Sequence, residues 1–390
     1  MQTKIEVSTR ILDWIIRSIP LESIPDKVLS SIQKWRSGDS QPTFNQLEKV
    51  SKALGIPFGY FFLQTPPNED LSIVEYRTID SIALEKPSRN LIDTLHDMEQ
   101  IQDWTYNYLL SIESDRLKFV GALKNQTNSI EIAKYIRQLL GIQDDWFKSA
   151  KTADESFSLL RNAMSNAGVI VMMSGIVENN THRSLQIDEF RAFALVNEYA
   201  PLIFINSNDS INGKVFSLIH EFVHICIGEN SLFNDRYSTG QKVDKTEVIC
   251  NAVAAEILVP IDLFTKEWFS ESDDVDATMR ISSLAKEFKC GDTVIARRAL
   301  DKKLITHEQY EFISKEAVKR YKEYMQRKKE RKEGGGDFYR TVATRIDKRF
   351  LRMLLSSVQE GTTMYTDAFR LTNTNRSTFT SLAEKVGGAI

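Results

Sequence analysis

The sequence contains little cysteine and no long hydrophobic run. Its three cysteines, Cys226, Cys250 and Cys290, are an odd number without paired short spacing, which favours a reducing compartment over a disulfide framework. The most apolar stretches, residues 168–177 and 200–207, are shorter than the roughly 20 residues that a membrane-spanning helix needs. The first twenty residues lack the basic start and long apolar run of a signal peptide. We therefore expect a soluble, cytoplasmic protein without a membrane partner.

Neither sign of charge dominates the chain. Its 50 basic and 53 acidic residues give a net charge of −3, which neither demands nor excludes nucleic acid, because local patches matter more than totals. Hydrophobic residues make up 42% and aromatic residues 10% of the chain, enough for an ordinary buried core, which argues against a disordered protein. A length of 390 residues suggests two or three domains.

The apolar residues of the first half follow helical spacing. Phe44, Leu47, Val50 and Leu54 repeat at helical intervals, and we expect residues 1–67 to form a compact helical domain. The pair Pro66-Pro67 marks its end. A helical connecting region is expected over residues 68–165.

The pattern changes at Gly168. The segments 168–177 and 190–207 are rich in β-branched and aromatic residues, and a turn-like sequence divides the second, so we predict a strand followed by a hairpin. Helical spacing returns at residues 213–227 and 246–259, where Pro260 ends the second helix.

Two further boundaries complete the predicted organisation. Strands and helices together occupy residues 166–333, followed by the triple glycine 334–336, which is typical of a linker. Residues 337–390 should form a helical tail. The predicted fold class is therefore α+β: a mostly helical chain with a small β-sheet at its centre.

The segment FSLIHEFVHICIG, residues 216–228, places two of the five histidines four positions apart. On a helix these positions share a face, so His220 and His224 can direct their imidazoles at one point. Two imidazoles suit Zn²⁺, which prefers nitrogen and sulfur donors in a tetrahedral shell. Glu221 points roughly 100° around the helix from His220, beside the open coordination position. There it can take a proton from water whose pKa the metal has lowered.

A catalytic zinc site needs a third protein ligand, and the next predicted helix offers one. Glu247 lies 23 positions after His224, far enough for the chain to turn and bring a second helix alongside. Asn251 follows Glu247 by four residues and shares its face, where its amide could orient a ligand from the second shell. Tyr237, between the two helices, is a candidate donor to a developing oxyanion.

The alternative to a metal site is a chance pattern on a buried helix. Two bare imidazoles in such a helix would be unfavourable without partners, which favours the metal site. Cys226 and Cys250 are alternative ligands by position, but buried cysteine usually behaves as a small hydrophobe. His96, His182 and His307 have no ligand-like neighbours, and we expect no metal there.

The segments FRAFALVNEYAPLIFIN, FSLIHEFVHICIG and EVICNAVAAEILVP resemble the ImmA/IrrE family of metallo-endopeptidases. The resemblance covers roughly residues 165–265. It implies a zincin-like fold with Zn²⁺ held by two histidines and a glutamate. Carried over by position, His220, His224 and Glu247 become the ligands and Glu221 the general base. Asn251 matches the asparagine of the family's second helix.

Residues 30–67 resemble the latter half of an XRE-type helix-turn-helix domain. The sequence departs from that pattern, because only 21 positions separate Trp14 from Trp35, and Pro20 and Pro25 fall between them. This leaves too little room for two complete helices. The candidate recognition segment, residues 26–35, has only two basic residues for phosphate and base contacts. We expect a degenerate domain that serves as a scaffold or docking module, with DNA binding as the alternative.

Members of the ImmA/IrrE family cut or inactivate transcriptional repressors after a stress signal, and some are the toxic half of toxin–antitoxin pairs. The resemblance thus implies a zinc-dependent endopeptidase whose substrate is a specific protein, a repressor or an antitoxin. Two alternatives stay open at this point. One is a DNA-binding or protein-binding regulator whose peptidase fold acts as sensor or scaffold, and the other is a structural zinc module.

Overall fold

The computed structural model describes residues 4–19, 24–67, 87–233, 245–270, 275–330 and 338–386. The chain is mostly helical and contains a small mixed sheet, so the predicted α+β class is confirmed. It divides into two compact units. The first comprises Met1–Tyr76 and Ile82–His96, and the second Arg77–Ser81 and Asp97–Ile390.

The first unit is built from short helices around its own core. These are α1 (Thr9–Ser18), α2 (Asp26–Arg36), α3 (Phe44–Leu54) and the 3-10 helix η2 (Phe58–Phe62). Thr43 and Gln46 form a capping box that begins α3, and Gly55 ends it with a left-handed φ of 66°. Its core consists of fully or nearly fully buried side chains from all four helices, among them Leu12, Ile32, Leu47 and Phe61.

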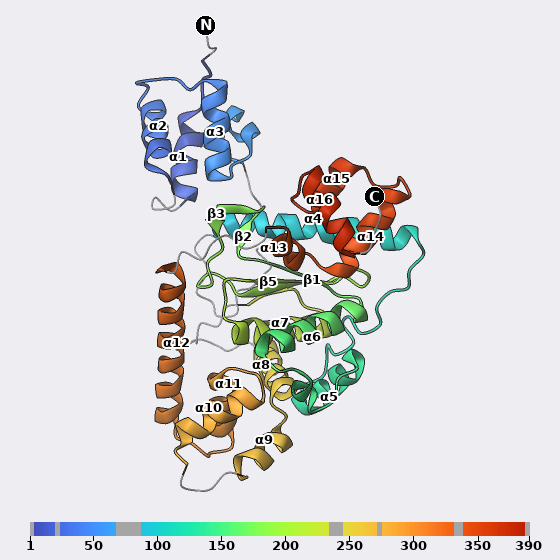
Figure 1. Ribbon diagram of the computed structural model, residues 1–390. Coiled ribbons are helices and arrows are strands. Elements are labelled where there is room, and N and C mark those ends of the chain that lie inside the picture. Colours follow the sequence, from blue (N-terminus) through green and yellow to red (C-terminus); the bar gives the residue numbers. More distant parts are fainter. Residues whose placement is uncertain are drawn as a thin grey trace. The chain divides into compact units, whose positions relative to one another are not determined.

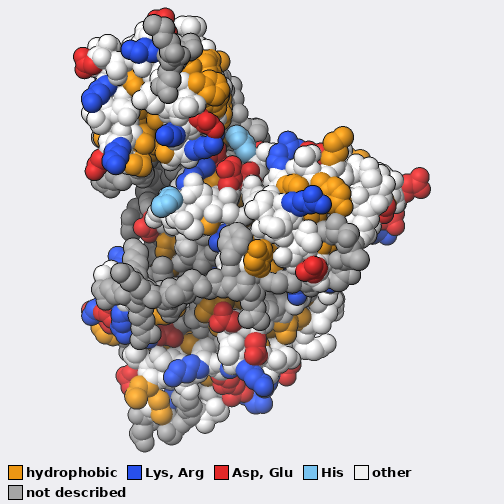
Figure 2. All heavy atoms as spheres, turned by 45° about the horizontal axis from the view of Figure 1, so that its top comes forward, with side chains coloured by type: hydrophobic (Ala, Val, Ile, Leu, Met, Phe, Trp, Pro, Cys, Tyr) orange, Lys and Arg blue, Asp and Glu red, His pale blue; other side chains and the backbone are white. Residues whose placement is uncertain are grey.

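The surface of this unit has an aromatic side. Phe44 is 53% exposed and Phe62 48% exposed, and Phe58 contacts both rings edge to face. Figure 2 shows hydrophobic side chains gathered on one side of the unit. Arg36, at the end of α2, pairs with Asp13 of α1 at 2.7 Å. Residues 20–23, between α1 and α2, lie outside the described residues, and the helix-turn-helix character of this unit stays a prediction.

The centre of the second unit is a four-stranded mixed sheet in the order β1-β5-β4-β6. Strand β1 runs parallel to β5, whereas β4 is antiparallel to both β5 and β6. The predicted strand and hairpin correspond to β1, β4 and β5, while β3 and β6 were not expected. The strands are β1 (Ile170–Ser174), β2 (Ile176–Val177), β3 (Asn180–Ser184), β4 (Ala192–Leu195), β5 (Leu202–Asn206) and β6 (Ser231–Phe233).

Helices cover both faces of this sheet. Figure 1 shows α6 and α7 on one face and α13 and α14 on the other, with α8 beyond α7. The helices after α3 are α4 (Arg89–Ser111), α5 (Ser129–Leu140), η4 (Trp146–Ser149), α6 (Ala153–Ala167), α7 (Ile211–Ile227), α8 (Lys245–Leu258), α9 (Ile261–Trp268), α10 (Ala277–Glu287), α11 (Asp292–Asp301), α12 (His307–Glu330), α13 (Phe338–Arg345), α14 (Lys348–Gln359), α15 (Tyr365–Leu371) and α16 (Arg376–Val386).

The C-terminal helices pack against the outer edge of β1. The carboxylate of Asp347 accepts hydrogen bonds from the N–H groups of Arg349 and Phe350, so it caps α14. The same carboxylate accepts from the N–H of Val171 in β1 at 3.3 Å, while the Arg161 guanidinium donates to the carbonyl of Val171 at 2.7 Å. The main-chain N–H and C=O of Val171 on this edge of β1 are therefore both satisfied by side chains. The triple glycine 334–336 lies outside the described residues.

No single described helix is long and apolar enough to cross a membrane. Helices α8 and α9 meet the length and composition only as a pair, bent by 55° at their junction. Half of α8 is buried inside the second unit, which is the usual behaviour of an apolar core helix.

Candidate metal centre

Helix α7 carries the paired histidines through the core. The Ser210 hydroxyl accepts a hydrogen bond from the N–H of Gly213 and begins the helix, and Gly228 ends it with a φ of 88°. All residues from Ser217 to Ile227 are buried, because α7 packs against α6, α8 and strands β4 and β5. Packing on several sides thus fixes the orientation of the helix that carries the two histidines.

The structure brings His220, His224 and Glu247 together. The Nε2 atoms of the two histidines lie 3.1 Å apart. One carboxylate oxygen of Glu247, on α8, lies 3.1 Å from Nε2 of His220, and the other lies 2.7 Å from Nε2 of His224. One ligand atom from each of the three residues lies within 4.8 Å of the other two, and all three residues are buried.

These distances fit a tetrahedral metal ion. With metal–ligand bonds of about 2.0–2.1 Å, neighbouring ligands in a tetrahedron lie about 3.3 Å apart. Two of the three separations, each 3.1 Å, are close to this value, and the 2.7 Å contact between His224 and Glu247 is shorter. Two neutral imidazoles and one carboxylate are also the donor types of catalytic zinc sites. The residues present therefore fit zinc in both spacing and chemistry.

Glu221 lies beside this cluster with its two oxygens in different surroundings. Its Oε2 accepts a hydrogen bond from the Ser231 hydroxyl of β6. Its Oε1 is buried and has no hydrogen-bond partner among the described residues. Burial raises the pKa of Glu221, and the charges of His220 and His224 and the Ser231 hydrogen bond offset only part of that rise. A carboxylate with a raised pKa and one uncommitted oxygen is suited to accept a proton.

Glu247 has the opposite electrostatic character. Burial by itself would raise the pKa of its carboxyl, but hydrogen bonds and charges from His220 and His224 outweigh it and lower the pKa to about 2. Glu247 is therefore ionised at neutral pH, as a metal ligand must be.

The cysteines near the centre are neutral thiols. Cys226 and Cys250 are free and buried. Burial raises the pKa of Cys250 to about 11, although a contact with His224 works in the other direction, and burial also raises the pKa of Cys226. Neither joins the cluster of potential ligands among the described residues, and their interpretation as small hydrophobes stays a prediction.

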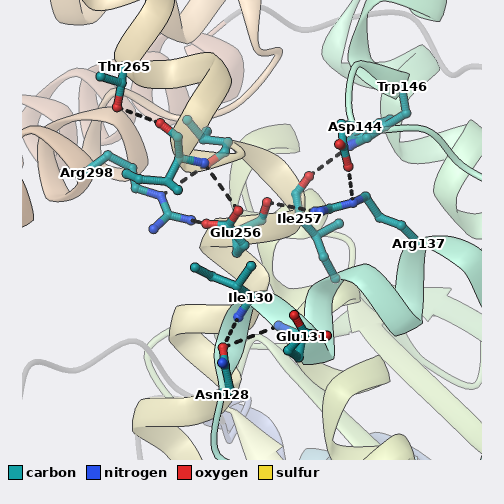
Figure 3. A network of polar contacts seen from close by, with 12 residues as sticks. Asn128, Ile130, Glu131, Arg137, Asp144, Trp146, Glu256, Ile257, Thr265 and Arg298 are labelled. Carbon is teal, nitrogen blue, oxygen red and sulfur yellow. Dashed lines mark hydrogen bonds and ion pairs between the residues drawn. The ribbon is translucent and has the colours of Figure 1, made fainter.

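A buried polar network holds the far end of α8. Arg298 of α11 pairs with the Glu256 carboxylate at 2.7 Å and also donates to the carbonyl of Val259. Arg137 of α5 donates to the carbonyl of Glu256 at 3.2 Å, and the Trp146 indole donates to the carbonyl of Ile257 at 2.9 Å. Figure 3 shows these residues converging on the end of α8 from both sides. Because the network joins α8 to three other elements, α5, η4 and α11, it fixes the helix that presents Glu247.

The remaining predicted residues lie outside the cluster. Asn251 is on α8, one turn after Glu247, but it is exposed, and its part in orienting a ligand stays a prediction. Tyr237 lies outside the described residues. His96, His182 and His307 are all exposed, and the expectation that they bind no metal stays a prediction. The sequence analysis missed Ser231, because a single serine in a three-residue strand carries no recognisable motif.

Two comparisons with protein families match parts of the chain. Residues 167–300 match the M78 peptidase family, described as the IrrE N-terminal-like domain. We call this segment, about a third of the chain, the IrrE-like domain. It contains α7, α8 and the whole metal cluster, and it supports the resemblance to ImmA/IrrE metallopeptidases.

Residues 346–385 match a second family, described only as a domain of unknown function. No curated protein and no solved structure matches the chain. The IrrE-like domain and its cluster thus indicate a function like that of a zinc metallopeptidase.

Proposed function

We propose that the chain is a zinc-dependent endopeptidase that cleaves one specific protein in the cytoplasm. The observation that carries this proposal is the convergence of His220, His224 and Glu247 within 4.8 Å, near enough to the Glu221 carboxylate for their charges to act on it. A purely structural zinc site has no use for such a base, whereas peptide hydrolysis requires one.

Zinc bound by this cluster would polarise the scissile carbonyl and make a water molecule acidic enough to react near neutral pH. His220 and His224 would hold the ion from one helix face, and Glu247 would complete the ligand set from α8. Glu221 would accept a proton at Oε1 and pass it to the leaving amine. The apolar side chains of α7 exclude bulk water, so the charges in the site act in a medium of low dielectric constant.

For the substrate we propose a transcriptional repressor or an antitoxin, in a stress, mobile-element or toxin–antitoxin circuit. Support comes from the resemblance of the IrrE-like domain to a family with such substrates. The first unit would then dock a protein partner, and its aromatic side around Phe44 and Phe62 supplies an apolar contact surface. DNA is the alternative partner of that unit.

The test expresses the wild type, Glu221→Gln and Glu229→Gln together with the neighbouring open reading frames. New protein termini are then identified by mass spectrometry. Glu229 is exposed and adjacent to the end of α7, so its change to glutamine is a matched control. We expect one partner protein to be shortened with the wild type and with Glu229→Gln, but not with Glu221→Gln. Identical termini in all three cultures would overturn the proposal.

A further inference from the structure

The candidate site is closed to any protein substrate in the structure described. The exposed fractions are 0% for His220 and Glu221, 2% for His224 and 4% for Glu247. Proton transfer requires the reacting groups to come within about 3 Å of the base, directly or through one water. The side chains around Glu221 therefore block the approach of a polypeptide to its carboxylate.

Strand β6 is the element that lies on the base. Ser231 is 2% exposed and donates its hydroxyl hydrogen to Oε2 of Glu221. Leu232, the next residue, is 4% exposed. The strand, which lies at the end of the sheet, thus places the Ser231 side chain directly on the carboxylate of Glu221, the proposed general base.

β6 is held less firmly than the strand at the opposite end of the sheet. It has three residues, and among the described strands it pairs with β4 alone. Its pairing joins Ala194 with Ser231 and Ala192 with Phe233. One further hydrogen bond, from the N–H of Val196 to Oδ1 of Asn230 at 2.6 Å, holds the residue before the strand. At the other end, five-residue β1 is secured on its outer edge by Arg161 and Asp347.

We propose that β6 is an autoinhibitory strand, whose Ser231 covers Glu221 and whose release opens the site. The proposal rests on the proposed peptidase function, of which it names the regulation. The edge of β4 exposed by this release presents main-chain N–H and C=O groups. An extended segment of a protein substrate can pair with those groups in place of β6. Such pairing would lay the segment alongside the base, in the position from which Ser231 had been withdrawn.

The hydrogen bonds of Asn230 and Ser231 exist only in the closed state, so their loss should favour the open state. A typical hydrogen bond shifts such an equilibrium about fivefold. Asn230→Ala is therefore expected to raise the affinity of the zinc-loaded full chain for a fluorescent peptide hydroxamate about fivefold. Adding Ser231→Ala should raise it further. Glu229→Ala, which removes an exposed neighbouring side chain, is the matched control and should leave the affinity unchanged.

A second measurement does not depend on metal or activity. In the metal-free full chain, amide hydrogen exchange of Ala192 and Ala194, the β4 residues whose main chain faces β6, should become about fivefold faster in Asn230→Ala than in Glu229→Ala. Equal exchange in the two variants would show that β6 does not open, and would overturn the inference. So would unchanged or weaker hydroxamate binding by Asn230→Ala in zinc-loaded protein. A chain that holds no zinc, but shows the faster exchange, would instead refute the proposed function and leave the opening of β6 standing.

Discussion

The Nε2 atoms of His220 and His224 lie 3.1 Å apart, and the two oxygens of Glu247 face them one to one. The residues belong to two helices that pack against each other through the core. Because α7 and α8 are held by apolar packing, the three donors are brought together by the fold itself. A metal ion would thus bind a site whose geometry already exists.

Metal content should follow the donor residues. We expect about one zinc per chain in the wild type, and a loss of affinity of more than about 100-fold in His224→Ala, since changes to supporting residues alone weaken such sites 10–100-fold. Glu221→Gln should keep its zinc, because Glu221 is not among the converging ligands. Elemental analysis after dialysis against a weak chelator measures both. Equal zinc in His224→Ala and wild type would remove that histidine from the ligand set.

Chelation should destabilise the protein without unfolding it. The second unit has a large apolar core that includes α7 and α8, so its helices do not depend on metal. A ligand at 100 times its Kd stabilises by about 2.7 kcal/mol, so we expect removal of zinc to lower the melting temperature by roughly 5–10 °C. Far-ultraviolet circular dichroism should stay unchanged at room temperature. Complete loss of helical signal on chelation would favour a structural zinc module.

The buried pair of Glu256 and Arg298 offers a test of how α8 is supported. Arg298→Met leaves the Glu256 carboxylate buried without its ionic partner, which should destabilise the protein by about 3–5 kcal/mol. The neighbouring Arg297 makes an exposed pair with Asp301, so Arg297→Met should change stability by less than about 0.5 kcal/mol. Urea denaturation compares the two. Similar midpoints for both variants would mean that the network does not hold α8.

The same variant should also change the pH dependence of stability. Burial raises the pKa of Glu256 above its ordinary value of 4.5, although Arg298 opposes the rise. Without Arg298 the pKa in the folded state rises further. A carboxyl whose pKa is higher in the folded than in the unfolded state stabilises at low pH, and this contribution disappears as pH rises through the folded value. The deficit of Arg298→Met, measured by urea denaturation, should therefore grow as the pH rises above the ordinary carboxyl pKa of 4.5, and a deficit that shrinks would contradict this sign.

Asp347 should be important for stability although it is not among the residues of the metal cluster. Asp347→Ala removes the cap of α14 and leaves the buried N–H of Val171 without its acceptor, so we expect a loss of about 2–4 kcal/mol. Asp367→Ala, which breaks only an exposed pair with Arg370, is the control and should have little effect. Thermal denaturation of both variants makes the comparison. If Asp347→Ala lost as little stability as Asp367→Ala, the C-terminal helices would not be fixed through Asp347.

The sequence predicted the parts of the site that depend on local geometry. His220 and His224 share a helix face by their spacing alone, and the strands around residues 168–177 and 190–207 were visible in their β-branched composition. Glu247 could be proposed as the third metal ligand because the apolar residues around it have clear helical spacing and because the segment resembles a known family.

Other features depend on contacts between distant parts of the chain, and no local pattern encodes them. Ser231 meets Glu221 only because a three-residue strand turns back beside α7. Asp347 meets Val171 across 176 positions of sequence. The parallel pairing of β1 with β5 was likewise not predictable, since a strand's partner is decided by how helices α6 and α7 fill the space around the sheet.

The way in which Asp347 and Arg161 cover β1 has a practical consequence. A shortened chain ending near residue 330 would leave the Val171 N–H without Asp347, at a strand edge where other polypeptides can attach. Such a truncated chain would be prone to aggregate, and a loss of the proposed activity in it would say little about the role of the metal cluster. The last fifty residues are better probed by single replacements than by deletion.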